Sequence, residues 1–204
     1  MENKKEHWEN VYAQKKLTEV SWYEQTPETS LSIIANFNLP KNAAIIDIGG
    51  GDSLLADHLL ALGYSSITVL DISNNAIERA KLRLKDKSLA INWITSDVLE
   101  LSNNIQYDLW HDRAAFHFLT DEADQKRYAE VAAAHLQTGG LMLISTFALN
   151  GPEKCSGLPV TRHSGAILID LFQSQFQSMG SINHCHLTPF NTEQAFTYNS
   201  FRKI

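Results

Sequence analysis

A nine-residue segment, Ala44–Asp52, places the strongest constraint on the fold. It reads Ala-Ile-Ile-Asp-Ile-Gly-Gly-Gly-Asp, so a short Ile-rich run ends at an acidic residue and a glycine cluster. The run is too short for a helix and is typical of a buried parallel strand. The glycines permit a tight turn and let a ligand approach bare backbone. Because a Leu-rich helical pattern follows at once, the segment predicts a strand, a turn and a helix.

Acidic residues flank this glycine turn and indicate the ligand that it accepts. Asp47 lies two residues before Gly49, and Asp52 follows Gly51. Ser53 stands where a dinucleotide-binding loop has its third glycine. Such a loop offers amide hydrogens to a pyrophosphate, whereas carboxylates repel phosphate and attract cations. We therefore expect a cofactor that carries an ammonium or sulfonium group.

Two further predicted strands also end at an acidic residue. Asp71 closes a β-branched run and lies 20 residues beyond Gly51, where an acid can accept both ribose hydroxyls of an adenosine cofactor. Asp97 closes the next strand, and its carboxylate and the Val98 amide can read the edge of adenine. Each acid alone is equally typical of a helix cap or turn. Three acids at three successive strand ends favour a cofactor site.

Because of these residues, the chain resembles a class I S-adenosylmethionine-dependent methyltransferase over nearly its whole length. The resemblance is carried by Asp47–Gly51, Asp71, Ser96–Val98, Tyr107–Asp112 and Gly139–Ser145, the last as a turn and fifth strand. It departs from the family at Gly50, where Cys or Ala is frequent, and at Ser53. It implies S-adenosylmethionine as the cofactor, bound by Asp47, Gly49, Gly50, Gly51, Asp52, Asp71, Ile72, Asp97, Val98 and Asp112.

The alternation of strand and helix patterns predicts a doubly wound α/β fold, a mostly parallel sheet with helices on both faces. Strands are expected near 44–48, 67–71, 91–95, 107–112 and 141–147, and helices near 53–62, 74–86 and 121–136. Two closely spaced segments, 176–187 and 194–202, suggest a C-terminal antiparallel hairpin, and the family resemblance implies a seven-stranded sheet of this kind. We expect one domain, 1–204, with a helical cap or lid over 1–40 and a core over 41–204.

Composition limits the classes of protein to which the chain can belong. Its 204 residues, 44% of them hydrophobic, suffice for one core. We expect a cytoplasmic protein without a membrane span, because no apolar run or signal-peptide core is found and Cys155 and Cys185 show no pairing pattern. The net charge of −6 argues against a nucleic-acid partner. His184 and His186 share a strand face, but no second cluster has zinc-ligand spacing, so no metal is expected.

The catalytic candidates lie in His111–Phe118, which begins at the carboxyl end of a strand, where open α/β sheets have their crevice. Asp112, His111 and His117 are candidates for orienting or deprotonating the nucleophile, and Arg113 for fixing a substrate carboxylate. Strand parity places His111 and Arg113 on the opposite face from Asp112, so at least one of these sets is expected to pack or form ion pairs instead.

Two further clusters are candidates for substrate binding. Trp22 and Tyr23 form an aromatic pair flanked by acids, suited to a lid over a cation or a flat acceptor. Burial of Trp22 against the first helix is the plainer alternative. The Gly- and Pro-containing loop at 154–162 follows the fifth strand, and in similar methyltransferases such loops carry acceptor specificity. Within it, Arg162 is a candidate for holding an anionic acceptor and Cys155 for lining the wall.

The sequence therefore predicts an enzyme that transfers a methyl group by in-line displacement, which requires alignment of the nucleophile and exclusion of water. A small-molecule acceptor is preferred because the cap and loop are short. A protein lysine is the alternative, attracted by the acids around Trp22 and in 121–124. A nicotinamide-dependent oxidoreductase and a noncatalytic cofactor-binding protein are the remaining rivals. The first is disfavoured by the acid-flanked loop and the closing hairpin.

Overall fold

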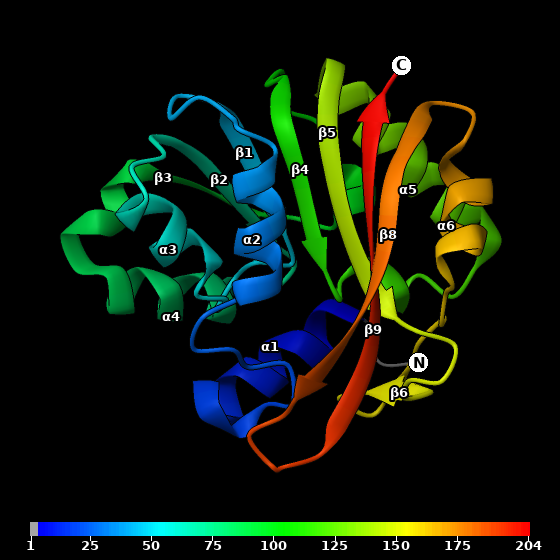
Figure 1. Cartoon of the computed structure of the whole chain (residues 1–204). Coiled ribbons are helices and arrows are strands. Elements are labelled where there is room, and N and C mark those ends of the chain that lie inside the picture. Colours follow the sequence, from blue (N-terminus) through cyan, green and yellow to red (C-terminus); the bar gives the residue numbers. More distant parts are fainter. Residues whose placement is uncertain (1–3) are drawn as a thin grey trace.

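The computed structural model describes residues 4–204 and has at its centre a seven-stranded sheet in the order β3-β2-β1-β4-β5-β9-β8 (Figure 1). β1, β2, β3, β4 and β5 pair in parallel, whereas β9 runs antiparallel to β5 and β8 antiparallel to β9. The strands are β1 (Ala44–Ile48), β2 (Ser66–Asp71), β3 (Ile91–Thr95), β4 (Tyr107–Arg113), β5 (Leu136–Phe147), β8 (Phe176–Leu187) and β9 (Glu193–Lys203). The predicted doubly wound sheet and closing hairpin are confirmed.

Six α-helices are found in the described residues: α1 (Lys4–Gln14), α2 (Glu28–Asn36), α3 (Leu55–Ala61), α4 (Asn74–Leu84), α5 (Glu122–His135) and α6 (Gly165–Phe172). Side-chain caps begin three of them, because Ser73, Asp121 and Ser164 each accept a hydrogen bond from a first-turn amide. A small separate ladder, β6 (Lys154–Cys155) with β7 (Leu158–Pro159), lies in the loop after β5.

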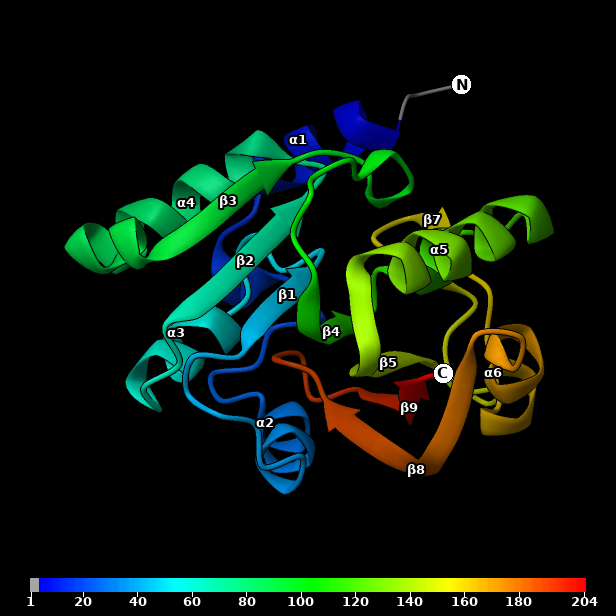
Figure 2. The same cartoon turned by 90° about the horizontal axis from the view of Figure 1, so that it is seen from above.

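The core lies in two layers, one on each face of the sheet. Figure 2 shows α2 and α3 on one face and α5 and α6 on the other. Alternate residues of one strand serve different layers: Ile45 packs with Leu55 of α3, whereas Ile46 packs in the layer that holds Tyr128 of α5. Strands buried on both faces read as continuous apolar runs, which is why β1 could be predicted from sequence.

The fifth strand differs from its prediction. It was expected over 141–147 after a turn at Gly139-Gly140, but strand structure begins at Leu136, which pairs with Tyr107. The register with β4 then shifts before Leu141 pairs with Leu109. Gly139, with φ of +79°, lies within this irregularity, so the glycine signal marked a bulge rather than a connecting turn.

The N-terminal segment crosses the end of the sheet at which the parallel strands finish. Figure 1 shows α1 at the end to which β4 points, and contacts join α1 to α4. The crevice of an open α/β sheet lies at this end. No helix in residues 4–204 has the length and apolar character needed to cross a bilayer.

Candidate functional site

The loop after β1 is bare backbone packed against two carboxylates. Gly49 has φ of +65°, which favours glycine, and its amide donates to the Leu70 carbonyl of β2. A Cβ atom at Gly50 would lie 2.2 Å from Asp47 Oδ2, and one at Gly51 would lie 2.6 Å from Asp71 Oδ2. The glycine cluster therefore lets the loop close over both acids.

Asp71 is the buried carboxylate at the end of β2. Its Oδ2 accepts from the Gly51 amide at 3.0 Å and its Oδ1 from the Ser73 amide at 2.8 Å. Burial raises the pKa of Asp71 to about 7, while the two amides act to lower it. Each oxygen retains a lone pair, so the carboxylate can also accept from a diol.

A cavity of about 130 Å³ opens beside Asp71. One part of its wall consists of the predicted adenosine-binding residues Asp71, Ile72, Asp97 and Val98, together with Ser96. Asp97 Oδ1 accepts from the Leu99 amide, which fixes the turn that follows β3. The acids at the ends of β2 and β3 therefore line one cavity, whereas Asp47 does not line it.

A second cavity, of about 50 Å³, adjoins the first. The two share five wall residues: Tyr12, Trp22, Ile48, Gly49 and Arg113. The smaller one also contains Asp47, Gly50, Asp52 and His111. Because the glycine loop forms a common wall, an elongated ligand can lie across both cavities with one end toward Asp71 and the other toward Asp47.

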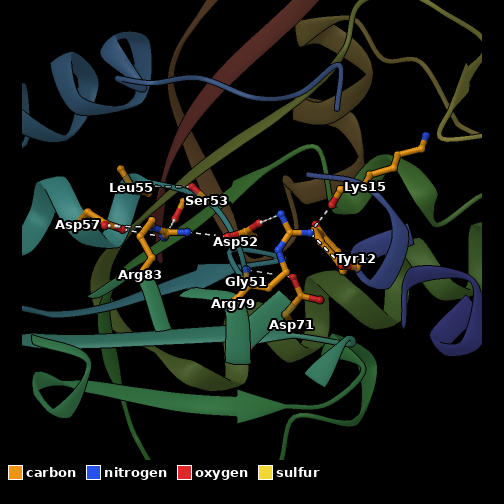
Figure 3. A network of polar contacts seen from close by, with 10 residues as sticks. All are labelled: Tyr12, Lys15, Gly51, Asp52, Ser53, Leu55, Asp57, Asp71, Arg79 and Arg83. Atoms are coloured by element: carbon orange, nitrogen blue, oxygen red, sulfur yellow. Dashed lines mark hydrogen bonds and ion pairs between the residues drawn. The ribbon is translucent and has the colours of Figure 1, made fainter. Parts of the chain in front are cut away.

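Asp52 is engaged by two arginines of α4, as Figure 3 shows. Its Oδ2 lies 2.8 Å from Arg79 Nη2 and its Oδ1 2.5 Å from Arg83 Nη1. Arg83 also bonds Asp57. From the sequence, Asp52 is expected to attract a cationic cofactor. In the structure, two arginines of α4 already neutralise its charge. This pairing could not be read from the spacing because α4 lies about thirty residues further along the chain.

Helix α1 is fixed to α4 by its middle residue Glu9 and near its C-terminal end. Glu9 accepts from the Ser73 hydroxyl and from the Asn74 and Asn75 amides, and these bonds act to lower its pKa against the opposing effect of burial. Arg79 donates to the carbonyl oxygens of Tyr12 and Lys15 (Figure 3). α1 is therefore held over the cavities by bonds that use the N-terminus of α4 and one of its cations.

An aromatic cluster, Trp8, Tyr12, Trp22 and Phe118, lines the larger cavity. The Trp8 ring centroid lies 5.0 Å from that of Phe118 and 5.7 Å from that of Trp22, both in edge-to-face geometry. Trp22 therefore packs against the first helix, and it also lines both cavities. Tyr23 lines the smaller cavity.

Arg113 is already occupied within the protein. Its guanidinium donates to the Trp22 carbonyl and the Tyr198 hydroxyl and lies 3.1 Å from Glu24 Oε1. His186 contacts the same carboxylate through Nδ1. Its Nε2 donates to the Ser21 carbonyl, because a carbonyl oxygen only accepts hydrogen bonds. The expected role of Arg113, fixing a substrate carboxylate, competes with these contacts. The residue instead ties segment 21–24 to the end of β4.

Asp112 points to the opposite face from His111 and Arg113, as strand parity predicted. It is fully buried, and its oxygens accept from the Ala115 and Phe116 amides and the Tyr128 hydroxyl. Burial raises the pKa of Asp112 to about 6. It lines neither cavity, so its contacts fix the loop after β4 rather than reach a ligand.

Two other candidates also lie away from the cavities. His117 is buried between aromatic rings, and desolvation lowers its pKa to about 3. Arg162 bonds Glu153 and the Gly151 carbonyl. Cys155, in contrast, lines the larger cavity, and burial raises the pKa of its thiol to about 11. Sequence reasoning missed Trp8, Tyr12 and Glu9, although Trp8 and Tyr12 have the spacing of one helical face.

Comparison with known proteins shows similarity to methyltransferases. A family model described as a methyltransferase domain matches residues 46–142, which run from β1 into β5 and contain the strand-end acids. This part of the chain resembles a methyltransferase domain. The chain is 26% identical over 157 residues to EEF1A lysine methyltransferase 2 of Homo sapiens, covering 70% of this chain and 66% of the relative.

A further relative is also a methyltransferase, and solved structures share the fold. The ubiquinone biosynthesis O-methyltransferase of Rickettsia canadensis (strain McKiel) is 26% identical over 114 residues, or 56% of this chain and 47% of the relative. The chain therefore spans about half to two thirds of these curated relatives. A structure determined for the conversion of a disulfide bond into a thioacetal group during echinomycin biosynthesis has a TM-score of 0.82, at 18% identity, covering 98% of this chain and 92% of that one.

A second structural neighbour was solved with S-adenosylhomocysteine bound. The N-methyltransferase NodS from Bradyrhizobium japonicum WM9, in complex with S-adenosylhomocysteine, has a TM-score of 0.68 at 16% identity, covering 96% of this chain and 97% of that one. The donor set of this chain fits such a ligand. Asp71 can accept from a ribose diol, and the buried Asp47 Oδ2 has no partner in the described residues and can receive an ammonium.

Proposed function

We propose that this chain transfers the methyl group of S-adenosylmethionine to a small-molecule acceptor. The cofactor lies across the two cavities, with its adenosine toward Asp71, Ile72, Asp97 and Val98 and its amino-acid end toward Asp47 and Gly50. The glycine loop supports this placement, because Gly49 lines both cavities and Gly50 lines the smaller one, and neither residue has a side chain to fill them.

The observation that carries the acceptor assignment is the composition of the remaining cavity wall. Trp8, Tyr12, Trp22, Phe118 and Cys155 supply it, and these are apolar or aromatic groups. Both cations that line the larger cavity are paired, Lys4 with Asp124 and Arg113 with Glu24. Its two carboxylates, Asp71 and Asp97, lie at the adenosine end. A wall without a spare charge suits a neutral, largely apolar acceptor.

The protein then promotes the reaction by positioning the acceptor and excluding water. In the displacement the acceptor atom bonds to the methyl carbon as the bond from carbon to sulfur breaks, and the positive charge leaves sulfur. The described cavity walls offer no histidine free of protein partners, because His111 bonds Asp47 and Ser30. We therefore assign the aromatic wall to aligning an acceptor that arrives uncharged and with an available lone pair, such as a neutral amine.

A protein lysine is the second candidate, favoured by the likeness to EEF1A lysine methyltransferase 2 over 70% of this chain. The wall argues against it, since a lysine acceptor reaches its methyl donor as a long cation that benefits from a nearby free carboxylate. Of the acids that line the cavities, Glu24 and Asp52 are engaged by arginines.

The test is a labelling experiment with purified protein, radioactive S-adenosylmethionine and a desalted cell lysate to which its small-molecule fraction is added back. Label is expected in the small-molecule fraction, with S-adenosylhomocysteine released in equal amount. A panel of phenols, thiols and amines then identifies the acceptor atom. Label recovered in protein lysine after hydrolysis, and absent from the small molecules, would replace this proposal with the second candidate.

A further inference from the structure

Three buried polar side chains form a continuous chain beneath the smaller cavity. Asp47 of β1, His111 of β4 and Ser30 of α2 are between 1% and 3% exposed. His111 Nδ1 lies 2.6 Å from Asp47 Oδ1, and His111 Nε2 lies 2.9 Å from Ser30 Oγ. All three residues line the cavity. Three elements far apart in sequence therefore join to orient a single carboxylate.

One oxygen of that carboxylate lacks a partner. Asp47 Oδ2 is buried and receives no hydrogen bond from the described residues. A buried charged oxygen without a donor is costly, so a structure that retains one favours a ligand that supplies the donor. Gly50 packs against this oxygen, and a Cβ atom at that position would lie 2.2 Å from it.

The other acids of the smaller cavity are not available in this way. Asp52 is held by Arg79 and Arg83, and Glu24 is held by Arg113. Asp47 is bonded instead by a histidine, which in its neutral form donates a hydrogen bond without adding a positive charge. Among the three acids that line this cavity, Asp47 is thus the one whose protein partner is a histidine and not an arginine.

We infer that His111 and Ser30 are positioning residues that hold Asp47 with Oδ2 turned to the cavity, where it receives the ammonium of the cofactor's amino-acid end. Because a carboxylate only accepts, His111 Nδ1 carries the proton that is donated to Asp47 Oδ1. In the neutral imidazole Nε2 then accepts a hydrogen bond from the Ser30 hydroxyl. This role replaces the proton transfer expected of His111 from sequence. It rests on the cofactor assignment and is independent of the acceptor.

Binding measured by calorimetry with three adenosyl compounds tests this inference. S-adenosylhomocysteine has both the ammonium and the carboxylate, decarboxylated S-adenosylhomocysteine keeps the ammonium alone, and 5′-methylthioadenosine lacks both. His111→Leu is expected to weaken the first two by about tenfold, equivalent to ~1.4 kcal/mol. 5′-Methylthioadenosine should change by less than about twofold, because its contacts are at the Asp71 end.

Matched variants separate positioning from packing. His111→Asn places an amide donor where Nδ1 lies and should return affinity to within about threefold of the wild type. Ser30→Ala should weaken the two ammonium ligands by about threefold, and it covers the case in which His111→Leu fails to fold. His135→Leu removes a buried histidine of α5 that bonds Val131 and should leave all three affinities unchanged.

Equal weakening of all three compounds by His111→Leu would overturn the inference, as would an Asn variant no better than the Leu variant. Failure of the wild type to bind any adenosyl compound would overturn the cofactor assignment with it. A normal binding profile with no turnover of any small molecule would count against the proposed acceptor alone, so the two failures are distinguishable.

Discussion

The aspartates in this chain differ in function because they contact different groups. Asp71 accepts two loop amides and keeps lone pairs toward a cavity, whereas Asp52 is neutralised by two arginines. Asp112 accepts three donors on the other face of the sheet. Because a carboxylate acts through its free lone pairs and net charge, these residues differ in role despite their common position near strand ends.

Replacing Asp112 by Ala is expected to lower stability. The Tyr128 hydroxyl and two amides would lose their acceptor while buried, at a cost of about 3 to 5 kcal/mol. Asp112→Asn keeps a carbonyl acceptor and should lose less. Urea denaturation measures both. An Asp112→Ala protein of wild-type stability that binds cofactor and does not turn over would instead place this carboxylate in the reaction.

His117 is expected to contribute to acid sensitivity. Because its folded-state pKa is lowered to about 3, the unfolded chain binds a proton below pH 6.5 that the folded chain does not. Its stabilisation is complete above pH 6.5 and declines as the pH falls toward 3, by about 2 kcal/mol at pH 5. Replacing His117 by Phe should reduce the loss of unfolding free energy between pH 7 and pH 5 by about that amount.

Urea denaturation of both proteins at the two pH values measures this difference. Asp71 and Asp112 act in the opposite direction, because a carboxyl with a raised pKa loses stability as the pH rises, but they are common to both proteins and cancel. Parallel pH profiles for wild type and variant would show that His117 is charged in the folded state.

At the scale of elements, α4 connects the cofactor loop to the N-terminal cap. Its N-terminus receives Glu9, and its Arg79 contacts both Asp52 of the loop and the last carbonyls of α1. The loop and the cap share one guanidinium, so we expect their motions to be coupled. α1 has few buried side chains of its own, and contacts with α4 therefore decide whether it stays closed.

Replacing Arg79 by Met should loosen α1. The variant keeps the aliphatic stem and loses charged hydrogen bonds to Tyr12, Lys15 and Asp52. Amide exchange over residues 4–14 is expected to accelerate by about tenfold, with a parallel loss of affinity for S-adenosylhomocysteine. Arg127→Met, on the exposed side of α5, is the matched control. Unchanged exchange in α1 would mean that the aromatic cluster alone holds it.

At the scale of the whole molecule, the parallel strands deliver their functional groups to one end of the sheet. The cavities lie there because β1, β2, β3 and β4 all finish at that end, and α1 crosses it (Figure 1). The ligand thus contacts residues from the cap, the sheet and the loops together. Binding must therefore stabilise the molecule as a unit.

S-adenosylhomocysteine at one hundred times its dissociation constant should raise the unfolding free energy by about 2.7 kcal/mol. For a chain of this length that corresponds to a rise in melting temperature of about 5 to 10 °C. NADH at the same concentration should have no effect, because carboxylates at the glycine loop disfavour a pyrophosphate. Thermal melts followed by circular dichroism measure both, and equal stabilisation by NADH would contradict the cofactor assignment.

The amino-acid sequence by itself determined the parallel strands with α3, α4 and α5, the C-terminal hairpin and the cofactor class, but it did not indicate α6 or the β6–β7 ladder. These follow from local signals: apolar runs mark buried strands, and acids after β1, β2 and β3 mark one edge because parallel strands share a direction. The opposite facing of Asp112 and Arg113 also follows from the two-residue period of a strand.

Only the tertiary structure decided which of these acids remain available to a ligand. The partners of Asp52 come from α4, those of Arg113 from segment 22–24 and β9, and that of Asp47 from β4. Such pairs join residues far apart in the chain, and electrostatic and hydrogen-bond energies depend on distances in space that spacing along the sequence does not encode. The same reason hid Trp8 and Tyr12, which reach the cavity because α1 folds back across the end of the sheet.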